Sequence, residues 1–244
     1  MSSFADPVPV RRTGARYPDV PSFLGAGIRD VECRATPGAD AGDWGIPLPP
    51  ELHQAVAKRQ WEYRAGRHCA RQALERLGAD AVVPGRDPSG APVWPDAVVG
   101  AITHTAGYAR AAVGWVRDFA GVGIDTEGVV PPARLKLGPS IAVPPEFAVA
   151  EAGGLDACEA FTLVFSAKEA VYKCLHPLVR RHFGFHDVRL TALDAATAGF
   201  TVELVTTLTP EWQSGTTLAG RFALDGSLLH TGVTVPAGLI GVVS

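Results

Sequence analysis

The sequence of 244 residues lacks the cysteine patterns and long apolar runs that mark several common classes of protein. Its four cysteines, Cys33, Cys69, Cys158 and Cys174, form no Cys-x-x-Cys pair, and no histidine lies at zinc-finger spacing from them. This scatter indicates neither a structural zinc site nor a disulfide framework and is typical of reduced thiols in the cytoplasm. No apolar run reaches the roughly 18 residues of a membrane-spanning helix. We therefore expect a cytoplasmic protein that is not embedded in a membrane.

The chain also lacks an excess of basic residues. It has 22 Lys and Arg against 25 Asp and Glu, which gives a formal net charge of -3. Broad binding to nucleic acid or to anionic membranes needs a dominant basic surface, so neither partner is expected. Any anion must instead be bound by a local group of cations. The hydrophobic content of 47% is ample for a buried core.

The order of predicted elements repeats along the chain. Residues 1–22 are rich in Pro, Arg and Asp without periodicity, and we expect a loosely held arm there. A helical pattern is followed by strand-like runs twice, once within 23–118 and again within 119–244. The sequence therefore predicts an arm and two similar α+β lobes, with a functional site at the junction of the lobes.

The first helical pattern covers residues 51–77 and ends at Gly78, where a C-cap glycine is expected. Gly66 lies inside this pattern and costs about 1 kcal/mol relative to alanine. We expect either a break in the helix or a close backbone approach at Gly66. The proline-rich segment 84–95 that follows is expected to be a loop.

Several cations lie in this first half. Arg64, Arg67 and Arg71 share one face of the predicted helix, which is either an anion-binding clamp or a solvated basic surface. Arg86 is the only cation of the predicted loop. His104 ends a predicted strand and faces the same way as Ile102, a position more typical of a histidine with a structural role.

Three carboxylates point to metal chemistry. Asp125 and Glu127 end the apolar run 119–127, and the period of two of a strand directs both acids to one face. Glu169 follows on a later helix, one turn from Lys173. Oxygen ligands of this kind suit Mg²⁺, with water and substrate phosphate completing its coordination. We therefore predict metal-assisted chemistry on a phosphate ester.

Five motifs, in their order along the chain, resemble those of the 4'-phosphopantetheinyl transferases. They are Gly66-Arg-His-Cys-Ala-Arg71, Gly90-Ala-Pro-Val-Trp-Pro95, Ile102-Thr-His-Thr105, Gly123-Ile-Asp-Thr-Glu127 and Phe165-Ser-Ala-Lys-Glu-Ala-Val-Tyr-Lys173. The likeness is greatest to the two-lobed type, which includes the enterobactin synthase component D-like and actinobacterial members. The resemblance implies a monomeric pseudo-dimer of two lobes, each a small antiparallel sheet packed on a long helix.

The resemblance further implies transfer of phosphopantetheine from coenzyme A to a serine of an apo acyl or peptidyl carrier protein. The implied reaction uses Mg²⁺, with Mn²⁺ as a substitute, and releases 3',5'-ADP to activate fatty-acid, polyketide or non-ribosomal peptide synthases. Two alternatives stay open, namely an unrelated Mg²⁺-dependent phosphohydrolase or nucleotidyltransferase and a coenzyme A-binding module without activity.

The resemblance also assigns roles to individual residues. The metal ligands that it implies are Asp125, Glu127 and Glu169. The coenzyme A contacts that it implies are Arg59, Arg67, Arg86, Thr103, His104, Lys168 and Lys173. The catalytic residues that it implies are Glu169, Lys173 and His104, with Glu169 as the base toward the carrier serine. The basic pair Arg180 and Arg181 is a candidate docking point for an acidic carrier protein.

Overall fold

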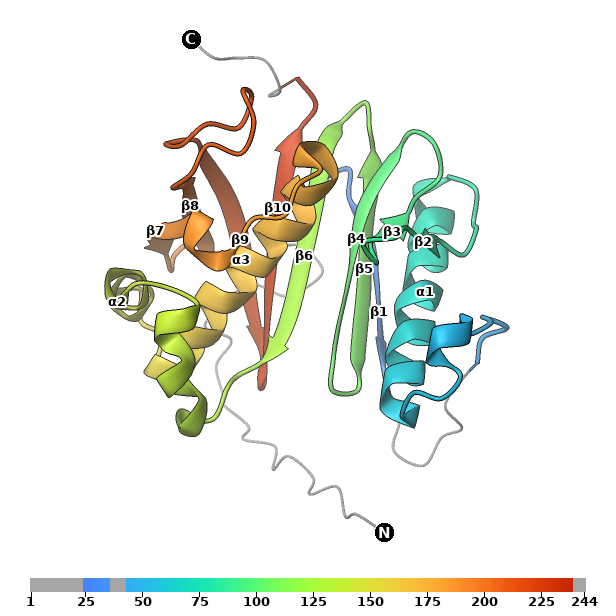
Figure 1. Ribbon diagram of the computed structural model, residues 1–244, viewed down its shortest axis with the longest axis horizontal. Helices are drawn as coiled ribbons and strands as arrows, with labels where there is room; N and C mark the ends of the chain where they lie inside the picture. The colour runs from blue at the N-terminus through green and yellow to red at the C-terminus, as the bar shows by residue number, and fades with distance from the viewer. Residues whose placement is uncertain (1–23, 36–42, 239–244) are drawn as a thin grey trace.

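The computed structural model describes residues 24–35 and 43–238. The arm predicted for residues 1–22 lies outside the described residues. The described chain is a mixed α/β protein with two larger antiparallel sheets, each covered by one long helix (Figure 1), and one two-stranded sheet. None of its described helices has the length and apolar character needed to cross a bilayer.

The first lobe consists of a three-stranded antiparallel sheet and helix α1. The strands, in the order β1-β5-β4, are β1 (Arg29–Arg34), β5 (Tyr108–Trp115) and β4 (Val98–Thr105). Helix α1 (Ala57–Leu77) packs on this sheet and ends at Gly78, which adopts the predicted left-handed conformation with φ 78°. A Cβ atom at Gly66 would lie 2.8 Å from Cγ2 of Ile102 on β4. Gly66 therefore permits a close approach of α1 to β4, and α1 is continuous through this position. Of the two expectations for Gly66, the close approach is confirmed and the helix break is wrong.

The second lobe consists of a five-stranded antiparallel sheet and helix α3 (Ala157–Val179), which packs on β6 and β10 (Figure 1). In sheet order the strands are β6 (Phe119–Gly128), β10 (Leu228–Pro236), β9 (Thr217–Asp225), β8 (Gly199–Leu204) and β7 (Val188–Asp194). Asp156 caps α3 by accepting the backbone N–H groups of Cys158 and Glu159, which satisfies donors that the helix start leaves unpaired.

Shorter elements fill the connections. They are the 3₁₀ turns η2 (Pro50–Leu52), η3 (Pro132–Ser140) and η4 (Phe185–Asp187), helix α2 (Pro144–Ala152), and the two-residue strands β2 (Gly85–Arg86) and β3 (Pro92–Val93). The pairing of β2 with β3 corrects the expectation that 84–95 is entirely loop. Only two residue pairs form this ladder, because the prolines around it remove backbone donors.

The lobes meet where β4 lies beside β6 (Figure 1). A small apolar layer fills the junction, formed by Leu24, Ile28, Ala101, Ala112, Val122, Ile124 and Ala223. Three of these seven residues are alanines, and the other four are aliphatic. The junction therefore holds side chains of β4 and β6 in direct contact.

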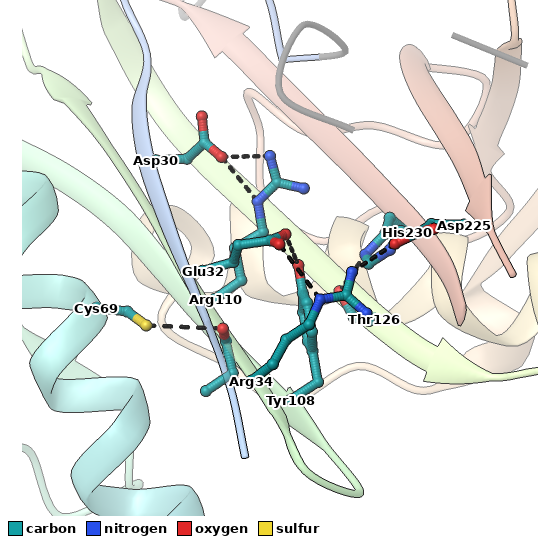
Figure 2. Close-up of polar contacts among 10 residues, drawn as sticks. Asp30, Glu32, Arg34, Cys69, Tyr108, Arg110, Thr126, Asp225 and His230 are labelled. Carbon is teal, nitrogen blue, oxygen red and sulfur yellow. Dashed lines mark hydrogen bonds and ion pairs between the residues drawn. The ribbon is translucent and has the colours of Figure 1, made fainter. Parts of the chain in front are cut away.

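A group of polar residues lies next to this apolar layer, and we call it the interlobe cluster (Figure 2). Its members are Asp30, Glu32, Arg34, Tyr108, Arg110, Thr126, Asp225 and His230. The guanidinium of Arg110 pairs with Asp30, and the hydroxyl of Tyr108 donates to Glu32 Oε2 at 2.8 Å. Across the junction Arg34 pairs with Asp225. The cluster therefore joins the lobes with charges of both signs.

Candidate active site

Two glycines of β6 let the acids of this strand meet α3. A Cβ atom at Gly123 would overlap the backbone of Ala170, and one at Gly121 would lie 2.7 Å from the carbonyl oxygen of Cys174. Alternate residues of a strand share a face, so Asp125 and Glu127 continue the face on which α3 lies. The alternating glycines at 121 and 123 are a signal in the sequence for this close contact.

Asp125 is at the centre of the site and is 3% exposed. Its Oδ1 atom accepts from Nζ of Lys173 on α3 at 2.6 Å and from Oγ1 of Thr103 on β4 at 3.2 Å. Its Oδ2 atom is buried and has no hydrogen-bond partner among the described residues. Residues from both lobes therefore hold one oxygen of this carboxylate and leave the other one unpaired.

Glu127 and Glu169 add negative charge around Asp125. Burial, followed by repulsion from Asp125, raises the pKa of Glu127 to about 7, while Lys173 opposes the shift. Burial also raises the pKa of Glu169, with the Lys173 ammonium acting against it and the Asp125 carboxylate adding to it. The three carboxylates thus interact with one another, and they share one ammonium group.

These carboxylates fit a divalent cation. Within residues 24–35 and 43–238, no three His, Cys, Asp or Glu side chains are grouped so that they could hold a metal ion. The unpaired Oδ2 of Asp125 and the mutual repulsion of the acids nevertheless favour a hard cation, for which carboxylate oxygens are preferred ligands. In this structure the ammonium of Lys173 supplies part of the positive charge. The predicted ligands Asp125, Glu127 and Glu169 stay the candidates for binding such a cation.

A small cavity of about 140 Å³ lies between α1, β4 and the β2–β3 hairpin. Four cationic or titratable residues that we predicted line it together, namely Arg59, Arg67, Arg86 and His104. Arg67 is buried, which lowers its pKa, and its Nη2 donates to the carbonyl of Gly85 at 3.2 Å. Its Nε has no partner among the described residues. The cavity therefore offers buried N–H donors to an anion.

Sequence reasoning missed Glu62, which also lines this cavity. Its buried carboxylate lies 3.4 Å from Nη1 of Arg59, 3.6 Å from Nδ1 of His104 and 3.7 Å from Nζ of Lys58. Burial lowers the pKa of His104, and Glu62 opposes this shift. The spacing of three between Arg59 and Glu62 was the available signal, since it predicts neighbours on a helix surface.

Lys168 is not brought to the site. Its ammonium donates to the carbonyls of Ile141 and Phe185 and lies 2.8 Å from a carboxylate oxygen of Glu146. These three acceptors match the three protons of the ammonium group. This placement does not support the coenzyme A contact predicted for Lys168. The ammonium of Lys168 instead links α3 to α2 and η4 through these contacts.

The predicted arginine face of α1 is divided between two roles. Arg64 donates to the carbonyl of Ile46 and Arg71 to that of Trp44, both at 3.2 Å. These two arginines bind the segment before α1, so they do not form an anion-binding clamp with Arg67. Of the three, only Arg67 lines the cavity. A larger cavity of about 1050 Å³ lies over β8, β9 and β10, and its lining includes none of the predicted site residues.

Comparisons with known proteins place the chain among related sequences. The family model of the 4'-phosphopantetheinyl transferase N-terminal domain matches residues 49–114, and that of the 4'-phosphopantetheinyl transferase superfamily matches 121–224. The chain is 36% identical over 199 residues to 4'-phosphopantetheinyl transferase PptT of Mycobacterium tuberculosis, covering 78% of this chain and 86% of that protein.

Two further relatives show the same similarity. The chain is 37% identical over 192 residues to 4'-phosphopantetheinyl transferase Svp of Streptomyces mobaraensis, with 75% of each chain covered. It is also 37% identical over 151 residues to enterobactin synthase component D of Salmonella typhi, with 62% of each chain covered.

Proposed function

Because the chain belongs to the 4'-phosphopantetheinyl transferase family, we propose that it transfers 4'-phosphopantetheine from coenzyme A to a serine of apo acyl and peptidyl carrier proteins. The observation that carries the proposal is the group of three carboxylates and Lys173 on β6 and α3, beside the cationic cavity of α1 and β4. In this proposal the two lobes form a monomeric pseudo-dimer in the cytoplasm, for which the four free cysteines are suited.

The cationic cavity would bind phosphate groups of coenzyme A. That substrate carries a pyrophosphate and a 3'-phosphate, whereas the whole chain has a net charge of -3. Arg59, Arg67 and Arg86 provide local donors, and guanidinium groups bind phosphate oxygens with strong, directed hydrogen bonds. His104 adds a ring nitrogen on the same wall.

The three carboxylates of Asp125, Glu127 and Glu169 would bind Mg²⁺ or Mn²⁺. When bound, this metal would neutralise negative charge on the pyrophosphate and so favour departure of the leaving group. Lys173, whose ammonium lies 2.6 Å from Oδ1 of Asp125, would donate to the same phosphate oxygens.

Glu169 would act as the general base. The carrier serine oxygen attacks the phosphorus next to pantetheine, and its proton passes to the Glu169 carboxylate. The bond between that phosphorus and the bridging oxygen breaks, which releases 3',5'-ADP. The raised pKa of Glu169 suits this role, because a carboxylate with a higher pKa accepts a proton more readily.

The carrier protein would dock near the end of α3. Arg180 is exposed at the helix C-cap, and Arg181 donates to the carbonyl of Leu208 at 2.9 Å. Arg180 is therefore the better candidate for contact with an acidic carrier. Arg180→Glu should raise the KM for the carrier while leaving the KM for coenzyme A unchanged.

The proposed function is tested by incubating the protein with coenzyme A, Mg²⁺ and a panel of apo carriers from fatty-acid, polyketide and non-ribosomal peptide synthases. Mass spectrometry should show a phosphopantetheine adduct on the carrier serine together with free 3',5'-ADP. Absence of the adduct from every carrier would overturn the proposal. Cleavage of coenzyme A without a carrier would favour a phosphohydrolase instead.

A further inference from the structure

Thr103 occupies a position that the predicted phosphate contact does not explain. It is 2% exposed and lies on β4 between Ile102 and His104. Ile102 and His104 both line the cationic cavity, whereas alternation along the strand turns Thr103 to the opposite face. The side chain of Thr103 therefore faces β6 and not the cavity.

The hydroxyl of Thr103 has two partners on β6. It donates to Oδ1 of Asp125 at 3.2 Å and accepts the backbone N–H of Thr126 at 3.0 Å. A hydroxyl group has a single proton, so the bond to Asp125 leaves none for a phosphate oxygen. The acceptor side is used as well, because β6 is the edge strand of its sheet and Thr126 turns its N–H toward β4.

These bonds determine which oxygen of Asp125 is free. Thr103 and Lys173 both bind Oδ1, one from each lobe, and Oδ2 is left buried without a hydrogen-bond partner among the described residues. A carboxylate held through one oxygen has a fixed plane and presents the other oxygen in one direction. Groups that orient a metal ligand in this way typically change metal affinity by about 10- to 100-fold when they are removed.

We infer that Thr103 is a positioning residue that orients Asp125 so that its Oδ2 atom is presented to the divalent cation. This inference rests on the proposed function, because it takes Asp125 as a metal ligand. It differs from the role that the resemblance implies, in which Thr103 touches coenzyme A. It also gives the first lobe a part in the metal site, whose three carboxylates all come from the second lobe.

The test compares Thr103→Val, which keeps the shape but removes the hydroxyl, with Thr103→Ser, which keeps the hydroxyl. Mn²⁺ binding is measured from the electron paramagnetic resonance signal of the free ion, without carrier or turnover. Thr103→Val should weaken Mn²⁺ binding by about 10-fold or more, and Thr103→Ser should stay within about twofold of the wild type. Calorimetric binding of 3',5'-ADP in metal-free buffer should be unchanged in both variants.

Two results would overturn the inference. Wild-type Mn²⁺ affinity in Thr103→Val would show that the hydroxyl does not orient Asp125. Weaker binding of 3',5'-ADP to Thr103→Val without metal would show a direct phosphate contact. Thr103→Ala, which also removes the hydroxyl but adds no branched atom, replaces the valine variant if that variant does not fold. Failure of carrier modification by the wild type would overturn the proposed function but would leave the Mn²⁺ comparison intact.

Discussion

The polar groups on the two faces of β6 differ in how their charges are paired. On the face that meets α3, three carboxylates share the ammonium of Lys173, and the pKa of Glu127 rises to about 7. On the other face Thr126 pairs with His230 of the interlobe cluster, Oγ1 to Nδ1 at 2.9 Å. In that cluster Arg110 pairs with Asp30 and Arg34 pairs with Asp225 (Figure 2).

This difference indicates that the carboxylate face is suited to binding a ligand, whereas the interlobe cluster stabilises the contact between the lobes. Each guanidinium of the interlobe cluster is paired with a carboxylate, and the hydroxyl of Tyr108 donates to Glu32. Burial lowers the pKa of His230 to about 3, so this histidine is neutral at physiological pH. Asp125, Glu127 and Glu169 together keep a negative charge that Lys173 alone does not neutralise, and an added cation or proton would lower their mutual repulsion. Perturbed carboxylates at a junction are typical of functional sites, whereas paired charges are typical of structural ones.

The largest effect is expected from a substitution that removes the proposed general base from the carboxylate face. Glu169→Gln should lower the rate of carrier modification by about 100- to 10,000-fold, because the amide cannot accept the serine proton. Binding of coenzyme A should persist. The rates are measured by mass spectrometry of the carrier, and the dissociation constant of coenzyme A by calorimetry.

The matched control for this variant is Glu151→Gln on helix α2, where the side chain is exposed. This control should keep the wild-type rate. A Glu169→Gln protein that modifies carriers at the wild-type rate would refute the assignment of Glu169 as the base.

A second substitution disrupts the interlobe cluster. It should lower the free energy of unfolding and leave metal binding unchanged. Asp30→Asn removes the carboxylate that pairs with Arg110, whose side chain is 1% exposed. Loss of one partner from a buried pair costs about 3 kcal/mol or more, which lowers Tm by roughly 6 to 12 °C in a chain of this size. Thermal denaturation followed by circular dichroism measures the change.

The control for Asp30 is Asp118→Asn, which removes an exposed pair with Arg117 at 3.8 Å. That change should alter the free energy of unfolding by less than about 1 kcal/mol. Mn²⁺ affinity should be unchanged in both variants. A loss of Mn²⁺ binding in Asp30→Asn would show that the two faces of β6 are not independent.

A third experiment separates the cavity from the rest of the arginine face of α1. Arg67→Gln should weaken metal-free binding of 3',5'-ADP by about 10-fold or more, because charged hydrogen bonds contribute roughly 1.5 to 3 kcal/mol. Arg71→Gln, on the same helix face but bonded to Trp44, should leave the affinity unchanged. Equal losses in both variants, measured by calorimetry, would indicate a general charge effect in place of a cavity contact.

Periodicity predicted the elements well because it reports local burial. The strand-like runs predicted after the second helical pattern correspond to β7 through β10, and the acids of β6 share the predicted face. The helix predicted around Glu169 extends from Ala157 to Val179. These features depend on neighbours in the sequence, so the pattern of apolar residues contains them.

Contacts between distant segments were beyond such reasoning. Lys168 looked like a second cation beside Lys173, but its partners come from α2, η4 and the segment before α2. Thr103 looked like a neighbour of His104 in function, yet the two side chains lie on opposite faces of β4. A motif lists residue types, whereas the direction of each side chain is set by the packing of elements around it.

The smallest expected effect concerns the charge of Glu127. Its pKa in the folded protein, about 7, lies above its usual 4.5, so the folded chain keeps a proton that the unfolded chain has released between these pH values. Stability of the metal-free wild type should therefore fall as pH rises from about 4.5 to about 7. Glu127→Gln has no such charge and should be more stable at pH 8 by roughly 1 kcal/mol, or about 2 to 4 °C in Tm, since partial exposure screens the repulsion.

Thermal denaturation of Glu127→Gln and wild type in metal-free buffer at pH 5 and pH 8 measures this difference. The Tm gain of the variant should be small at pH 5 and larger at pH 8, while Glu75→Gln, an exposed glutamate of α1, should show no such dependence. A gain that is equal at both pH values would mean that Glu127 is not held against the other carboxylates. Saturating Mg²⁺ should raise the Tm of the wild type more than that of Glu127→Gln, because a bound cation relieves the repulsion that the substitution has already removed.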